Sequence, residues 1–206
     1  MCALNHSQSI ILASKSPRRR EILERFGFSV DVRIPQGIRE VNLGESGMDT
    51  PEKVVQENAI RKADFVSSGE LCVLASDTIV MLDGVQYGKP DSREQAFRFL
   101  TDLSGKTHQV FSSFCLKHRN RQQMGWDVSR VSFKSLDSTQ IMDYMEKVHV
   151  MDKAGAYAIQ DGGESIIARL EGSFYTVMGL PIEKILSVLQ QWEYPIPPCN
   201  GARDTF

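Results

Sequence analysis

The residues best suited to chemistry lie near the start of the chain, in the segment ASKSPRR at 13–19. It follows an apolar run at 10–12, so we expect a short strand, a polar turn and then a helix. Ser16 suits the N-cap of that helix and Pro17 its first turn. A helix N-terminus offers backbone N–H groups and the positive end of a dipole, and serines and arginines lie at the same point. We interpret this segment as a binding site for linked phosphates, which predicts a protein that handles nucleotides.

Asp77 interrupts the longest β-like apolar run, at 71–82. An unpaired carboxylate inside a sheet is unfavourable by several kcal/mol, as an order of magnitude. Two interpretations fit this position. Asp77 either ends a strand and bonds to a turn, or it is a general base or metal ligand at a cleft, where perturbed carboxylates gather. Thr78, the next residue, can donate a hydrogen bond to the same ligand.

Other candidates have weaker signals. Lys89 follows a glycine, which lets a backbone approach a ligand closely, although an exposed lysine is equally expected. Lys62, on a predicted helix, and Glu40, in a polar loop, read by themselves as solvated charges. Gln160 lies in a segment of small residues, which is either an ordinary loop or a place where an amide can donate and accept at the edge of a nucleobase.

A mixed set of helices and strands must position these residues. Helical spacing, caps and stop signals predict helices over 17–26, 51–66, 92–103, 138–148 and from Pro181 onward. Apolar runs predict strands over 10–12, 28–34, 71–82, 108–117, 126–136, 164–170 and 174–178, with a polar turn at 118–125. Because helices and strands do not alternate cleanly, we expect an α/β fold with a mixed sheet.

The bulk composition is that of a globular protein. The chain has 206 residues, 41% hydrophobic and 24% charged, which is enough for one large domain or two intimate lobes. The net charge is −2, whereas a general nucleic-acid binder usually has an excess of basic residues. P-loop, dinucleotide-binding and nucleophile-elbow motifs are absent from the sequence, so those enzyme classes lose support. The ends, 1–8 and 195–206, read as loosely ordered.

The four cysteines are scattered and form no metal-binding motif with the histidines. Cys72 and Cys115 lie in apolar runs and are expected to be buried thiols, which fits a reducing compartment. No run reaches membrane-spanning length, and the N-terminus has no leader pattern. We therefore expect a cytoplasmic protein with no membrane partner.

Several separated motifs resemble, in the same order, those of the Maf family of nucleoside triphosphate pyrophosphatases, over roughly residues 10–190. The motifs are LASKSPRR at 12–19, KA at 62–63, SDTIV at 76–80, GKP at 88–90, LSGKTH at 103–108, DKAGAYAIQ at 152–160 and GLP at 179–181. The resemblance implies a single domain over 1–206. Its fold would be an elongated, curved mixed sheet flanked by helices, with two lobes and a deep cleft, as in the inosine-triphosphate pyrophosphatases. It also implies hydrolysis between the α and β phosphates, which yields a nucleoside monophosphate and pyrophosphate.

The same resemblance implies roles for individual residues. Asp77 matches the family's proton acceptor. Glu40, with Asp77, matches the position that holds a divalent cation, Mg²⁺ or Mn²⁺, although Arg39 departs from the usual Asp-Glu pair. The phosphate-handling positions are matched by Ser14, Arg18, Arg19, Lys62 and Lys89.

The resemblance extends to the base. Arg18, Thr78 and Gln160 match the dTTP/UTP branch, whereas the 7-methyl-GTP branch tends to carry Trp, Gln and Glu at these positions. An amide suits the mixed donor and acceptor edge of thymine or uracil, while a carboxylate suits donor-rich guanine. Asp161 stands where the family usually has glycine, next to the base pocket.

Three alternatives stay open. The substrates could be modified pyrimidine nucleotides, or the enzyme could be a purine-preferring inosine-triphosphate pyrophosphatase. The chain could instead be a nucleic-acid-binding or division-regulating protein that uses residues 14–20, although we expect no nucleic-acid partner. Maf relatives are often dimers, so a homodimer is a candidate assembly.

Overall fold

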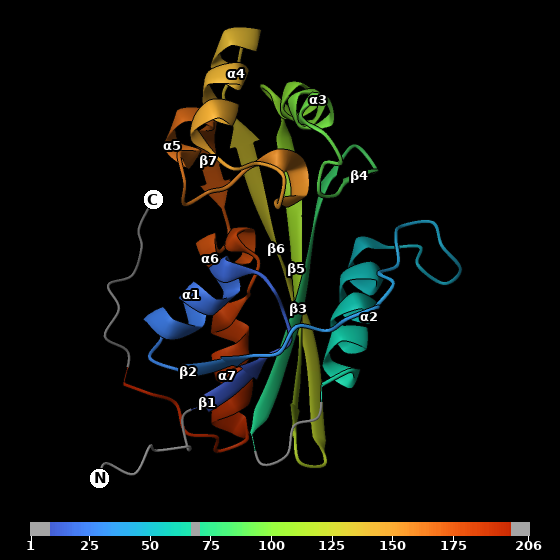
Figure 1. The fold of residues 1–206 in the computed structure, drawn as a ribbon, viewed down its shortest axis with the longest axis vertical. Coiled ribbons are helices and arrows are strands. Elements are labelled where there is room, and N and C mark those ends of the chain that lie inside the picture. Colours follow the sequence, from blue (N-terminus) through green and yellow to red (C-terminus); the bar gives the residue numbers. More distant parts are fainter. Residues whose placement is uncertain (1–8, 67–70, 199–206) are drawn as a thin grey trace. The chain divides into compact units, whose positions relative to one another are not determined.

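A computed structural model describes residues 9–66 and 71–198 and has a mixed α/β fold (Figure 1). The helices are α1 (Pro17–Arg25), α2 (Pro51–Asp64), α3 (Arg93–Leu103), α4 (Ser138–Lys147), the 3₁₀ helix η2 (Ala154–Ala156), α5 (Gly163–Ile166), α6 (Phe174–Met178) and α7 (Ile182–Gln191). The strands are β1 (Ser9–Leu12), β2 (Ser29–Val32), β3 (Cys72–Leu82), β4 (Val85–Tyr87), β5 (Thr107–His118), β6 (Arg121–Phe133) and β7 (Ile167–Glu171).

The strands form one seven-stranded sheet in the order β2-β1-β3-β5-β6-β7, with β4 also paired to β3. β1 pairs in parallel with both β2 and β3, whereas β4 pairs with β3, and β7 with β6, in the antiparallel sense. The predicted mixed sheet is therefore confirmed.

The chain divides into two compact units. Of the described residues, unit 1 contains 9–66, 71–77, 112–127 and 179–198, and unit 2 contains 78–111 and 128–178. β3, β5 and β6 each contribute residues to both units. Within the described ranges, no helix is long and apolar enough to cross a membrane.

In unit 1, α2 packs on one face of the strands through small side chains. The core on this face consists of Ile11, Ala13, Ala59, Ala63, Val73, Ala75 and Cys115. Alternate strand residues such as Ile10, Leu12 and Leu74 are also fully buried, so the strands are covered on both faces, as parallel strands usually are. Figure 1 shows α2 on one side of these strands and α1 and α7 on the other.

Hydroxyl side chains occupy the N-cap positions of α1, α2 and α3, and two of the three make a capping hydrogen bond. Thr50 caps α2 by accepting a hydrogen bond from Lys53 N, and Ser92 caps α3 in the same way. Ser16 occupies the N-cap position of α1, but its side chain makes no capping hydrogen bond. The first turn of α1 is therefore not closed by its own N-cap side chain.

Three strand predictions were wrong. The polar turn is confined to residues 119–120, and β6 already begins at Arg121, because hairpin pairing satisfies the backbone of polar residues as well as apolar ones. Residues 174–178 form α6 rather than a strand, since Ser173 Oγ accepts from Thr176 N and starts a helix that this short, mostly apolar run cannot signal by itself. Residues 163–166 form α5 before β7 begins.

The end of the described chain packs near the end of α1. Gly27 stops α1 with a φ of +82°, and a Cβ there would lie 2.8 Å from Pro197 Cβ. Pro197 is buried in this position. The rest of the expected loose tails, 1–8 and 199–206, lies outside the described residues.

Candidate functional site

Strand β3 presents Asp77 to the face that α2 covers. Side chains alternate along a strand, so Asp77 follows Val73 and Ala75, which both belong to the core against α2. Asp77 lies within β3 rather than at its end, and its exposed fraction is 7%. The strand-end interpretation of this residue is therefore wrong, and a carboxylate this buried needs partners.

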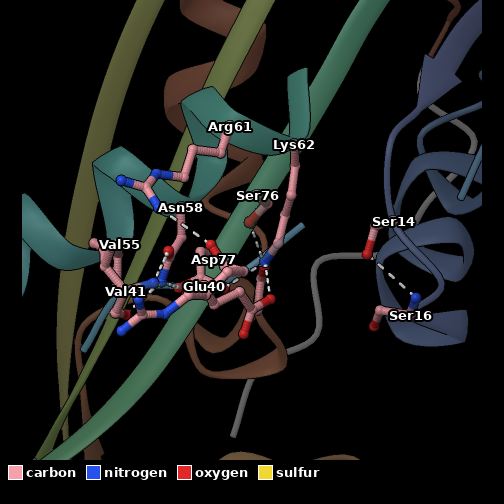
Figure 2. Close-up of polar contacts among 12 residues, drawn as sticks. Ser14, Ser16, Glu40, Val41, Val55, Asn58, Arg61, Lys62, Ser76 and Asp77 are labelled. Atoms are coloured by element: carbon pink, nitrogen blue, oxygen red, sulfur yellow. Dashed lines mark hydrogen bonds and ion pairs between the residues drawn. The ribbon is translucent and has the colours of Figure 1, made fainter. Parts of the chain in front are cut away.

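Two side chains of α2, one helical turn apart, bind the two oxygens of Asp77 separately (Figure 2). Asn58 Nδ2 donates to Asp77 Oδ2 at 3.0 Å, and Lys62 Nζ donates to Asp77 Oδ1 at 2.6 Å. Residues i and i+4 share one face of a helix, so a single element determines the orientation of the carboxylate. The buried charge is both paired and hydrogen-bonded, as a buried ion pair requires.

Lys62 joins a second carboxylate to the site. Its Nζ lies 2.6 Å from Glu40 Oε1, as well as 2.6 Å from Asp77 Oδ1. Glu40 belongs to the irregular segment between β2 and α2, and Asn58 anchors that segment at the next residue. Asn58 Oδ1 accepts from Val41 N at 2.8 Å, and Asn58 Nδ2 donates to Val41 O at 3.1 Å. The two carboxylates therefore meet at one ammonium group.

A second polar group in unit 1 is built around the carbonyl oxygen of Gly179. Arg19 Nε donates to it at 2.9 Å, and Ser76 Oγ donates to it at 2.8 Å. Arg19 Nη1 also donates to Ser14 Oγ at 3.0 Å, and Ser14 Oγ accepts a second hydrogen bond from Ser16 N at 3.2 Å. Because Ser76 directly precedes the buried carboxylate in β3, the same strand supports both polar groups.

Arg19 couples the two groups electrostatically. Burial lowers the pKa of its guanidinium, Asp77 raises it, Arg18 lowers it and Glu40 raises it. A guanidinium keeps its proton in proteins, so Arg19 stays positive although it is 9% exposed. Arg18, Arg19, Glu40 and Asp77 therefore lie close enough within unit 1 for their charges to interact.

The remaining predicted residues lie in unit 2, namely Thr78, Lys89 and Gln160. Gly155 N donates to Gly88 O at 3.0 Å, so the turn before Lys89 contacts the small-residue segment that leads to Gln160. Gln160 Nε2 donates to Asp161 Oδ2 at 3.3 Å. Gln160 Oε1 is buried and has no hydrogen-bond partner among the described residues. Buried acceptors are normally satisfied, so this oxygen suits a ligand that donates.

The two carboxylates fit a divalent cation that arrives with a phosphate ligand. Among the described residues, no group of three or more His, Cys, Asp or Glu side chains could hold a metal ion by itself. Glu40 and Asp77 nevertheless converge on a cation, because the ammonium of Lys62 stands in for one between them. Mg²⁺ is commonly held by one or two carboxylates, with water and substrate phosphates as its other ligands.

Sequence reasoning assigned no role to Asn58, Ser76 or Gly179. Asn58 had a detectable signal, since a polar residue beside the core positions of α2 and one turn before Lys62 shares that lysine's face. Gly179 had none, because it acts through its backbone carbonyl.

The fold and these groups define an α/β protein whose site combines buried carboxylates with serine, lysine and arginine donors, a set suited to anionic ligands and their counterions. The chain belongs to the Maf family, because the family model described as Maf-like protein matches residues 9–192. The family resemblance inferred from the motifs is thereby confirmed.

Named relatives match most of the chain. It is 40% identical to a dTTP/UTP pyrophosphatase of Symbiobacterium thermophilum over 192 residues, which cover 92% of this chain and 96% of the relative. A dTTP/UTP pyrophosphatase of Methylococcus capsulatus is 42% identical, with 88% and 89% covered. Among solved structures, the Staphylococcus aureus Ham1 protein has a TM-score of 0.48 at 15% identity and covers 89% of this chain and 99% of its own.

Proposed function

We propose that this chain is a nucleotide pyrophosphatase that hydrolyses dTTP and UTP between the α and β phosphates, releasing a nucleoside monophosphate and pyrophosphate. The observation that carries the proposal is the buried carboxylate of Asp77, whose two oxygens are held by separate donors beside Glu40 and in the electrostatic field of Arg19. Support for the pyrimidine nucleotides comes from the names of the relatives.

The phosphates are bound by the amino end of α1 in this proposal. Both lone pairs of the Ser14 hydroxyl are engaged by Arg19 and Ser16, so its own proton is left to donate, which suits a phosphate oxygen. Arg19 and Arg18 add positive charge, and the N-terminus of α1 adds its dipole. Lys62 and Lys89 complete the cationic set that neutralises the triphosphate.

Asp77 accepts the proton of the water that attacks the α-phosphorus. Its two oxygens are bound by Asn58 and Lys62, so the carboxylate is held in one orientation before the substrate arrives. Phosphoryl transfer depends mainly on positioning and charge stabilisation, and this preorganisation supplies the positioning. A general base of this kind typically contributes about 10²- to 10⁴-fold to the rate.

Glu40 and Asp77 would hold a divalent cation, Mg²⁺ or Mn²⁺, which when bound neutralises phosphate charge and activates water. The convergence of both carboxylates on Lys62 Nζ supports this assignment. With a cation held by the two carboxylates, the ammonium of Lys62 would be available to pair with phosphate oxygens.

The base is selected in unit 2. Gln160 Nε2 donates to the Asp161 carboxylate, so Oε1 is the end of the Gln160 amide that is offered to a ligand. Uracil and thymine carry an N–H donor between two carbonyl groups, which matches a buried acceptor. Thr78 adds a hydroxyl near the beginning of the unit 2 part of β3.

The protein is proposed to act in the cytoplasm. Cys72 and Cys115 are free and buried thiols, which fits a reducing compartment.

A panel of nucleoside triphosphates tests the function. Purified protein is incubated with Mg²⁺ and dTTP, UTP, modified pyrimidine nucleotides, GTP or ITP, and pyrophosphate release is measured. We expect the highest kcat/KM for dTTP and UTP. A preference for ITP would support the purine enzyme instead, and salt-dependent binding of DNA or RNA without any turnover would support a nucleic-acid-binding protein.

A further inference from the structure

We propose that Asn58 is a positioning residue that keeps the two carboxylates of the site in place. Its amide orients the Asp77 carboxylate directly and holds Glu40 through the neighbouring Val41. This inference rests on the proposed function, because it assigns Asn58 to the reaction that Asp77 performs.

Both N–H donors of this amide are used, and its carbonyl oxygen also accepts a hydrogen bond. An asparagine side chain has two N–H donors and one carbonyl acceptor. Val41 takes one of each, since its N–H can only donate to Asn58 Oδ1 and its carbonyl can only accept from Asn58 Nδ2. These two bonds fix the orientation of the amide, with its nitrogen toward Val41 O and its oxygen toward Val41 N. The second N–H is therefore directed to Asp77 Oδ2, at 3.0 Å.

Burial makes this arrangement rigid. Asn58 is 2% exposed and Asp77 is 7% exposed, so water does not readily replace either partner. Lys62 binds the other oxygen of Asp77 from the next turn of α2. Without the amide, the Asp77 carboxylate would be held at one oxygen only and could turn about its side-chain torsion.

A purely structural role explains only part of the geometry. Two hydrogen bonds to Val41 would suffice to attach the segment before α2, and they would not require an N–H aimed at a buried carboxylate. The third hydrogen bond, to Asp77, adds a second function. One side chain thereby fixes the orientation of the Asp77 carboxylate and the position of the segment that carries Glu40. Residues that orient such groups typically affect activity by about 10- to 100-fold when they are replaced.

Two substitutions test this role. Asn58→Asp keeps the shape and the acceptor for Val41 N, but it removes the N–H donors to both Asp77 and Val41 O and places a second carboxylate beside Asp77. Asn58→Leu removes all polar atoms at similar size and adds no charge. Lys53→Gln is the matched control, because Lys53 lies on the same helix in an exposed ion pair with Asp49. We measure kcat, KM and melting temperature for each variant, and determine the crystal structures of the wild type and Asn58→Asp.

We expect kcat to fall by about 10- to 100-fold in both Asn58 variants, with KM within about threefold of the wild type and Lys53→Gln unchanged. The crystal structure should show the Asp77 carboxylate turned from its wild-type orientation. A kcat within threefold of the wild type in Asn58→Asp, or a change confined to KM, would overturn the inference. If Asn58→Leu does not fold, the kcat of Asn58→Asp alone tests it.

Failure of the proposed function would look different. In that case the wild type would release no pyrophosphate from any nucleotide, and the crystal structures would still test the positioning role. An Asp77 carboxylate that keeps its wild-type orientation in Asn58→Asp would then overturn it.

Discussion

Replacing Asp77 with asparagine removes one negative charge from the site and changes its shape very little. In the wild type, Asn58 and Lys62 each donate to a different oxygen of Asp77. Asparagine offers only one acceptor oxygen in this place, and its other end carries N–H groups. One of the two donors would therefore face another donor, and the carboxylate that we propose as the proton acceptor would be gone.

The structure allows both effects to be estimated. Loss of one hydrogen bond that involves a charged group lowers the free energy of unfolding by about 1.5–3 kcal/mol. For a chain of this length, the melting temperature should fall by roughly 2–4 °C per kcal/mol. Loss of a general base should lower kcat by about 10²- to 10⁴-fold, which corresponds to about 3–5.5 kcal/mol in the activation barrier. The loss of activity should thus exceed anything that partial unfolding can explain.

The assay measures pyrophosphate release from dTTP at 25 °C, and calorimetry measures binding of a non-hydrolysable dTTP analogue. Asp127→Asn is the matched control, because it makes the same chemical change in an ion pair with Lys184 at 2.9 Å elsewhere in unit 1. We expect Asp77→Asn to bind the analogue and to lose turnover, while Asp127→Asn keeps both. If Asp77→Asn retains kcat within threefold of the wild type, Asp77 is not the proton acceptor.

Three further results are expected. Lys62→Met should bind Mn²⁺ more tightly than the wild type without nucleotide, because the ammonium no longer competes for the two carboxylates; weaker binding in a paramagnetic resonance titration would contradict this. Burial lowers the pKa of His108 from 6.5 to about 4, so the unfolded chain takes up the proton first as the pH falls. The free energy of unfolding should therefore drop by up to about 3 kcal/mol between pH 6.5 and pH 4, and denaturant titrations of His108→Gln should lack this part of the slope. Burial also raises the pKa of Cys72 to about 12 and that of Cys115 to about 11, so mass spectrometry after iodoacetamide treatment at pH 8 should find both unlabelled in the native protein and labelled only after unfolding.

Much of the fold could be predicted because secondary structure leaves a local signal. The predicted start of α1 at Pro17 and its end before Gly27 depend on residues only a few positions apart. Asp77 also stood out locally, since a charge within an apolar run contradicts its surroundings. Residues 174–178 were predicted wrongly because a run of five residues has no measurable period, and a hydrogen bond to the Ser173 side chain decided its conformation.

The sequence by itself determined the types of chemical group in this protein: serines and arginines at a helix start, an acid within a strand, and motifs in the order of one family. Only the tertiary structure decided which groups meet. Asn58 and Asp77 are 19 residues apart, and Arg19 and the carbonyl of Gly179 are 160 residues apart. A hydrogen bond acts over about 3 Å and selects partners by direction, so these contacts exist only once α2 has packed against β3 and the start of α7 has been brought to α1.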